Sequence, residues 1–107
     1  MRILKRPQVI KDLIELATYL AEDNLDVSER FLFAAEKTFQ KLSQFPQRGK
    51  LSNLTHPQLR DVRQQAIEGF RKHIIFYRLT DSEVEIVRVI HGKRDIEAIL
   101  KQDLEED

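Results

Sequence analysis

The side chains of this chain that could do chemistry are mainly basic, and they gather in its second half. Residues 58–94 hold eight basic and five acidic side chains, a net charge of +3. Arginine binds phosphate or carboxylate groups through two parallel hydrogen bonds, so clustered arginines favour an anionic partner. Seven residues of this segment are candidates for binding such a target: Arg60, Arg63, Arg71, Arg88, His91, Lys93 and Arg94.

Enzymatic chemistry has weaker support in the sequence. Cysteine is absent, the three glycines do not cluster into a phosphate-binding loop, and the three histidines lack the spacing of metal ligands. We therefore expect no metal and no cofactor. His91 could titrate near neutral pH and act as an acid or base. A histidine at a strand end is more often structural, however, and any single arginine could pair with a neighbouring carboxylate.

The charge of the whole chain is balanced but unevenly distributed. Its 107 residues include 18 basic and 18 acidic side chains, a length that suits one small domain. Residues 95–107 carry a net charge of −5. We expect one domain over residues 1–101 and a disordered acidic tail over residues 102–107. The chain has no apolar run near the ~20 residues that span a bilayer and no signal-peptide pattern. A cytoplasmic protein without a membrane partner is therefore expected.

Two amphipathic helices are predicted in the first half of the chain. Pro7 suits a first helical position, and apolar residues recur every three or four positions over residues 8–23. Asp26, with Glu29 three residues later, predicts the N-cap of a second helix that continues to about Gln44. Because the link between the helices is short, we expect them to pack as an antiparallel hairpin.

The remaining elements are predicted to form a sheet and a short helix. Strand patterns cover residues 2–6, 59–66, 70–79 and 83–90, and residues 95–101 could form a short helix. The expected fold class is α+β, in which an N-terminal strand and an antiparallel β-meander form a four-stranded sheet that packs against the helical hairpin. Neighbouring strands lie about 5 Å apart, so this sheet would bring distant basic residues together.

Several motifs in this order resemble the RelE/ParE superfamily of bacterial toxins, which belong to type II toxin–antitoxin modules and are also called plasmid stabilisation proteins. The motifs are Leu59-Arg60, Phe70-Arg71, Ile74-Ile75-Phe76-Tyr77 and Val87-Arg88-Val89-Ile90-His91-Gly92-Lys93-Arg94-Asp95. The last segment, together with Phe-Pro-x-x-Gly after the second helix, is similar to the ParE branch in particular. The resemblance covers residues 2 to about 100.

Resemblance to the ParE branch implies a toxin that binds DNA gyrase and poisons it without a known catalytic set. It also implies a cognate, ParD-like antitoxin that holds the toxin silent. We expect the antitoxin to dock on apolar residues of the first helix such as Leu16 and Tyr19. No direct sequence-specific binding of DNA by this chain is expected.

The RelE branch provides the alternative, a metal-independent endoribonuclease that cleaves mRNA on the ribosome. Arg71 and Arg94 fall where RelE-like arginines lie, and His91 would serve as the acid or base. Residues 95–107 hold no tyrosine or histidine, so the usual C-terminal acid–base group of that branch is missing. We therefore favour a binding inhibitor over an enzyme. A third alternative is a toxin fold that has lost its toxicity and serves as an interaction module.

Overall fold

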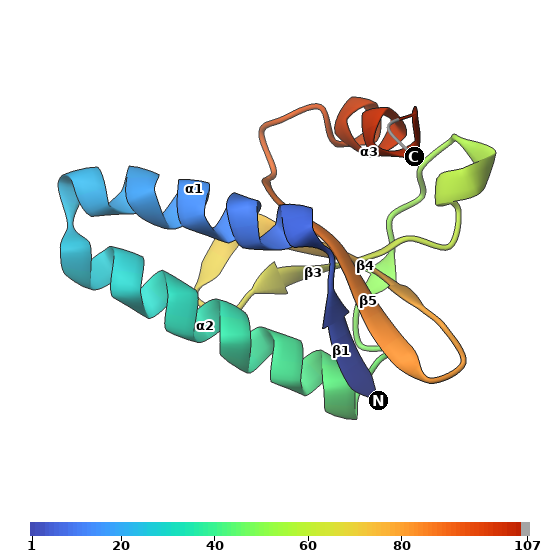
Figure 1. Ribbon diagram of the computed structural model, residues 1–107, viewed down its shortest axis with the longest axis horizontal. Coiled ribbons are helices and arrows are strands. Elements are labelled where there is room, and N and C mark those ends of the chain that lie inside the picture. Colours follow the sequence, from blue (N-terminus) through green and yellow to red (C-terminus); the bar gives the residue numbers. More distant parts are fainter. Residues whose placement is uncertain (106–107) are drawn as a thin grey trace.

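Two helices cover one face of a central sheet, and a third helix lies over the opposite face (Figure 1). The computed structural model describes residues 1–105. Helices α1 (Pro7–Asp23) and α2 (Leu25–Gln44) form the predicted antiparallel hairpin. Helix α3 (Ile96–Glu105) lies near the loop segment 52–62 on the other side of the sheet. None of the helices within residues 1–105 is long and apolar enough to cross a membrane.

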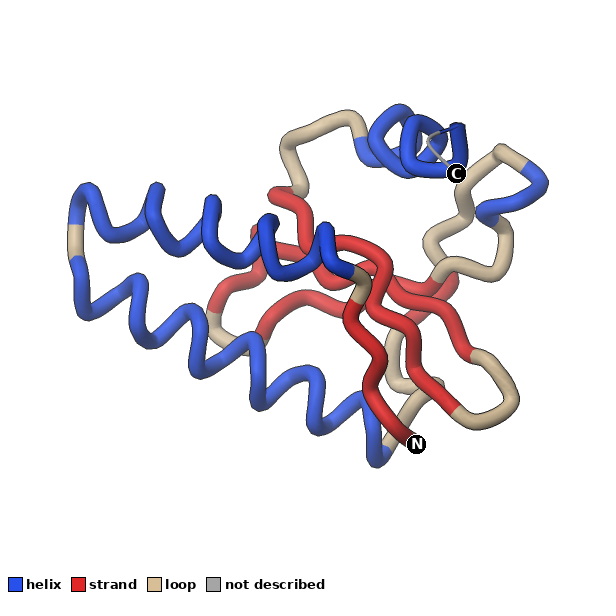
Figure 2. Tube along the Cα trace, viewed as in Figure 1, coloured by secondary structure: helices blue, strands red, loops and turns tan. Residues whose placement is uncertain are grey.

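The predicted meander is confirmed, and the sheet has one more strand than expected (Figure 2). The strands are β1 (Arg2–Lys5), β2 (Lys50–Leu51), β3 (Arg63–Ile67), β4 (Phe70–Leu79) and β5 (Glu83–His91), in the spatial order β1-β5-β4-β3-β2. Strand β1 runs parallel to β5, and all other neighbours are antiparallel. Strand β2 was not predicted because two residues are too few to show the alternation of apolar and polar residues that indicates a strand.

Alternate residues of strands β4 and β5 pack into different apolar clusters on the two faces of the sheet. Ile75 and Tyr77 face the helical hairpin, whereas Phe76 faces α3. The hairpin cluster also contains Val9, Leu13, Phe31, Ala35, Phe39, Leu42, Val84, Ile86 and Val89. The α3 cluster contains Leu59, Val62, Phe76, Val87, Ile90 and Leu100. The sheet is therefore the middle of three layers, and the two outer layers bury its two faces.

The helix boundaries differ from the prediction at one cap. Pro7 occupies the start of α1 as expected. Helix α2 is capped by Asn24, whose side-chain oxygen accepts a hydrogen bond of 3.3 Å from the Val27 amide. The predicted cap, Asp26, lies inside the first turn. A single residue links the two helices, so the extended backbone of Asn24 ends α1 and starts α2.

The start of β3 and the end of α3 also differ from the prediction. Residues Pro57–Leu59 form a 3-10 turn, so the strand predicted from residue 59 begins only at Arg63. Helix α3 continues to Glu105, so residues 102–105, which were expected to be disordered, are helical. The side chain of Leu104 packs against the α3 cluster and helps to order this last turn. Residues 106–107 of the predicted tail lie outside the described residues.

Candidate target-binding surface

Four of the seven predicted target-binding residues come together at one end of the sheet, where β4 begins and β5 ends. His91 pairs with His73 in the β4–β5 ladder, and the Gly92 amide donates a 2.7 Å hydrogen bond to the carbonyl of Lys72. This register places Arg71 beside the chain that follows β5. We call this surface the basic end; it consists of Arg71, Lys72, His91, Lys93 and Arg94.

Lys72 was not singled out from the sequence. In the sequence, only its position next to Arg71 indicates that Lys72 belongs to this surface. Its closeness to Gly92 results from the pairing of β4 with β5, which the sequence pattern does not show.

The cations of the basic end are available to a partner. Arg71, Lys72, Lys93 and Arg94 are all exposed, and within residues 1–105 they form no ion pair. The nearby carboxylate of Asp95 accepts a 3.1 Å hydrogen bond from the Ala98 amide at the start of α3, so it is engaged in capping that helix. The basic end therefore presents four exposed cations that are not held in ion pairs within the part of the chain that the structure describes.

His91 is held by its neighbours in a defined tautomer. Its Nδ1 accepts a 3.1 Å hydrogen bond from the Lys93 amide, which requires Nδ1 to be unprotonated. Its ring lies edge-on to the ring of His73, with 5.1 Å between the centroids. Burial lowers the pKa of His73, and the charge of a protonated His91 would lower it further. Within residues 1–105, no group of three or more metal-ligating side chains gathers here or elsewhere.

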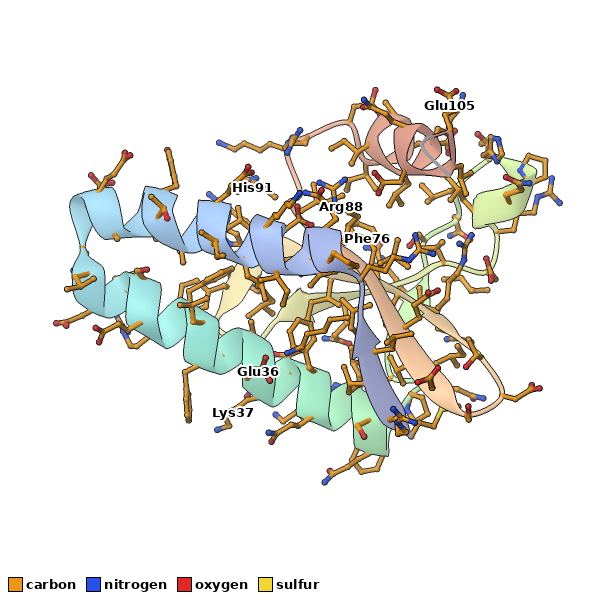
Figure 3. All side chains as sticks on the ribbon, in the orientation of Figure 1. Glu36, Lys37, Phe76, Arg88, His91 and Glu105 are labelled. Carbon is orange, nitrogen blue, oxygen red and sulfur yellow. The ribbon has the colours of Figure 1, made fainter. Side chains whose placement is uncertain are left out.

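Arg88 is buried and belongs to the framework of the protein instead of its surface (Figure 3). Its guanidinium donates hydrogen bonds of 2.8 and 2.9 Å to Asp12 on α1 and of 3.1 and 3.2 Å to Asp103 on α3. Burial alone would lower the pKa of Arg88, but the bonds with Asp12 and Asp103 raise it. Because two carboxylates already bind this charge, the structure does not place Arg88 with the other predicted target-binding residues.

The remaining two predicted arginines lie away from the basic end. Arg63 pairs with Tyr77, near the far end of β4, and its Nη1 donates a 2.7 Å hydrogen bond to the carbonyl of Gly49. Arg60 is exposed at the end of the 3-10 turn, outside the sheet. Arg63 therefore lies on the predicted strand, whereas the expectation that Arg60 lies on the same strand is wrong.

A second surface feature is a groove between α2 and the turn that joins β3 to β4. Its volume is about 320 Å³. We call it the α2 groove; it is lined by Arg30, Phe33, Ala34, Lys37, Glu68, Gly69 and Phe70. The side chain of Phe33 is 68 % exposed, and the Lys37 ammonium lies 5.6 Å from the centre of its ring. The groove thus combines an exposed aromatic ring with two cations.

The residues predicted to dock an antitoxin behave differently from each other. Tyr19 is 70 % exposed, as a docking residue should be. Leu16 packs against the hairpin cluster and is only partly accessible. Phe33 was not predicted as a docking residue, because the apolar periodicity of this helix identifies the residues that face the core. A large aromatic residue that departs from the stripe's helical spacing is the signal that would have identified it.

Comparisons with known proteins show similarity in sequence family and in fold. A family model described as "ParE toxin of type II toxin-antitoxin system, parDE" matches residues 3–96. A chain of the solved structure "Chromosomal ParDE TA system from P. aeruginosa" superposes with a TM-score of 0.68 and 16 % sequence identity, covering 85 % of this chain and 95 % of that chain. At this identity the likeness shows the shared fold. No curated protein sequence matches.

Proposed function

Because this chain belongs to the ParE toxin family of type II toxin–antitoxin systems, we propose that it inhibits DNA gyrase by binding and that a cognate ParD-like antitoxin neutralises it in the cytoplasm. The observation that carries the proposal of target binding is the basic end, whose four exposed cations form no ion pair within residues 1–105. Unpaired charges on a surface favour fast and specific association with a complementary partner.

A binding inhibitor agrees better with the geometry than a metal-independent endoribonuclease does. The α3 cluster covers much of the sheet face that is turned away from the hairpin, and Arg88 on that side is already bound by carboxylates. Nδ1 of His91 is occupied by the Lys93 amide. An RNA-cleaving site needs an available base, and Nδ1 of His91 cannot serve as one while it accepts this hydrogen bond.

For the antitoxin we propose docking in the α2 groove in addition to the exposed Tyr19. Phe33 offers an apolar contact, and Arg30 and Lys37 flank it. Such a groove fits an amphipathic segment that places an apolar side chain beside the Phe33 ring and carboxylates beside the two cations. This chemistry is consistent with a partner that folds onto the toxin.

The target is tested with purified gyrase. We expect the protein to inhibit DNA supercoiling, and we expect the double variant Lys93→Glu/Arg94→Glu to need at least tenfold more protein for the same inhibition. The matched control reverses two exposed charges elsewhere, Lys11→Glu/Lys101→Glu. Normal supercoiling in the presence of the wild-type protein, or cleavage of mRNA on translating ribosomes, would refute gyrase inhibition as the activity.

The antitoxin surface is tested by titrating the antitoxin against the toxin's activity. The variant Phe33→Asp should remain toxic but require more antitoxin for neutralisation, because a carboxylate replaces the apolar contact. Leu51→Asp is the control, since Leu51 is also exposed, at 45 %, but lies on β2, outside the helical hairpin. Equal neutralisation of Phe33→Asp and wild type would exclude the α2 groove.

A further inference from the structure

A second groove lies beside the β3–β4 turn and is strongly cationic. Its volume is about 260 Å³. We call it the turn groove; it is lined by Thr38, Lys41, Arg48, Gln65, Ala66, Ile67, Glu68, Gly69 and Arg71. It shares Glu68 and Gly69 with the α2 groove, but no aromatic ring lines it. An apolar side chain of a peptide would therefore find little to contact here.

The charges around the turn groove are unbalanced. Glu68 is its single carboxylate, and Lys41 forms an ion pair with it. The hydrogen bond and charge of Lys41 lower the pKa of Glu68, and Lys37 and Arg48 contribute in the same direction. Arg48 and Arg71 are exposed and form no ion pair within residues 1–105. Two guanidinium groups thus remain free at one groove.

Positive charge continues from the turn groove to the basic end. Arg71 lines the groove, and Lys72 follows it on β4. The hydrogen bond from Gly92 to Lys72 then brings Lys93 and Arg94 close to the same strand end. These cations surround one end of the sheet and are too many for a single phosphate ion. Their number suits a polymer that carries repeated negative charges.

We propose that the turn groove and the adjoining basic end bind the phosphate backbone of a nucleic acid. The guanidinium groups of Arg48 and Arg71 would bind phosphate oxygens through paired hydrogen bonds, and Lys72, Lys93 and Arg94 would contact neighbouring phosphates. Contacts to the backbone carry no sequence information, so binding is independent of base sequence. The inference goes beyond gyrase inhibition and does not depend on it.

The test measures fluorescence anisotropy of labelled nucleic acids with the purified full-length protein and no gyrase. Probes are a mixed-sequence 20-base-pair DNA duplex and a single-stranded RNA, studied separately at low salt. We expect at least one to bind, with an affinity that falls with salt at a log–log slope of roughly −3 to −4.5, as four or five phosphate contacts require. The variant Arg48→Glu/Arg71→Glu should bind at least tenfold more weakly.

Three results would overturn the proposal. The first is no binding of either nucleic acid at about 50 mM salt. The second is an equal loss in Lys11→Glu/Lys101→Glu, because net charge alone would then explain binding. The third is stronger displacement by polyglutamate than by unlabelled DNA at equal charge, which would identify an acidic protein segment as the ligand. Thermal unfolding of both double variants verifies that each is folded. The absence of gyrase from the assay keeps these results separate from the test of gyrase inhibition.

Discussion

Arg88 shows how one side chain can join three elements of this protein. It extends from β5 to Asp12 on α1 and to Asp103 on α3. Asp12 is only 4 % exposed and also accepts a 3.0 Å hydrogen bond from the Val89 amide. A buried charge costs free energy unless its partners are well placed, and here two carboxylates satisfy it. Residue type alone indicated a surface arginine, whereas the tertiary structure makes it internal.

Removing Asp12 should therefore destabilise the protein strongly. We expect Asp12→Ala to lower the free energy of unfolding by about 3–5 kcal/mol, because Arg88 would lose its most buried partner. Asp103→Asn should lower the free energy of unfolding by less, because Asp103 is more exposed than Asp12. The measurement is urea denaturation followed by far-UV circular dichroism.

Double substitution separates charge from packing. The variant Asp12→Ala/Arg88→Met should be less destabilised than the sum of its single variants, because the buried guanidinium is removed together with its most buried partner, and only the more exposed Asp103 is left without its cation. Simple additivity of the two costs would contradict this explanation.

His73 predicts a dependence of stability on pH. Burial, followed by the charge of His91, lowers the pKa of His73 below its ordinary value of 6.5, and its Nδ1 is buried without a hydrogen-bond partner. The unfolded chain therefore takes up a proton at higher pH than the folded one. The contribution of neutral His73 to stability is complete above about pH 6.5 and is lost as the pH falls toward the lowered pKa.

The measurement compares unfolding of wild type and His73→Phe from pH 8 to pH 5. Phenylalanine preserves the edge-on packing against Phe31 and Phe70 but does not titrate. Wild type should lose more stability than the variant below pH 6.5, while the difference between them stays constant near pH 8. A constant difference over the whole range would show that His73 does not contribute to the pH dependence.

At the scale of elements, hydrophobic periodicity predicted the hairpin and the meander but not their exact ends. The two helices were recognisable because their apolar residues recur over several turns. The cap was mistaken because Asp26 and Glu29 have the spacing of a capping box. The choice between Asn24 and Asp26 depends on where α1 ends, which periodicity does not determine.

The contributions of Asn24, the observed N-cap of α2, and of Asp26, the predicted one, to stability can be compared by substitution. We expect Asn24→Ala to lower the free energy of unfolding by about 1 kcal/mol, because the Val27 amide loses its acceptor. Asp26→Ala should cost only a few tenths of a kcal/mol through the helix dipole. Thermal unfolding of both variants tests this order. A larger cost for Asp26→Ala would mean that Asp26 is the true cap.

The candidate site was predictable in its chemistry and only partly in its membership. Arg71, His91, Lys93 and Arg94 were identified because they lie at the ends of two strands with clear patterns. Arg60 was misplaced because Pro57–Leu59 forms a 3-10 turn inside a segment whose alternation resembles a strand. Lys41 and Arg48 were missed because the turn groove joins α2 and the loop after it to β3 and β4, and such contacts between distant segments leave no local pattern.

At the scale of the whole molecule, a neutral chain separates its charges in space. The body carries the free cations of the turn groove and the basic end, and the residues from Asp95 onward carry most of the negative excess. Part of that excess is used internally, since Asp103 binds Arg88 and Glu97 accepts hydrogen bonds of 2.7 and 2.6 Å from Thr55. The net charge of the chain therefore understates the local positive charge at the turn groove and the basic end.

The two apolar clusters should unfold as one unit because strands β4 and β5 contribute to both. Leu42 is fully buried in the hairpin cluster, and Leu100 is almost fully buried in the α3 cluster. We expect Leu42→Ala and Leu100→Ala each to cost about 2–5 kcal/mol. In a Tyr19→Phe background the remaining tyrosine, Tyr77, reports on the hairpin cluster by fluorescence, while circular dichroism reports on all helices.

In the Leu100→Ala variant, both probes should shift to the same lower midpoint, because losing the α3 cluster exposes Phe76, whose neighbour Tyr77 belongs to the hairpin cluster. The wild type in the same background serves as the reference, and Leu42→Ala should move both probes together as well. An early transition seen only by circular dichroism, with Tyr77 fluorescence unmoved, would instead make α3 a separately unfolding unit. The face of the sheet beneath α3 could then open while the hairpin stays folded.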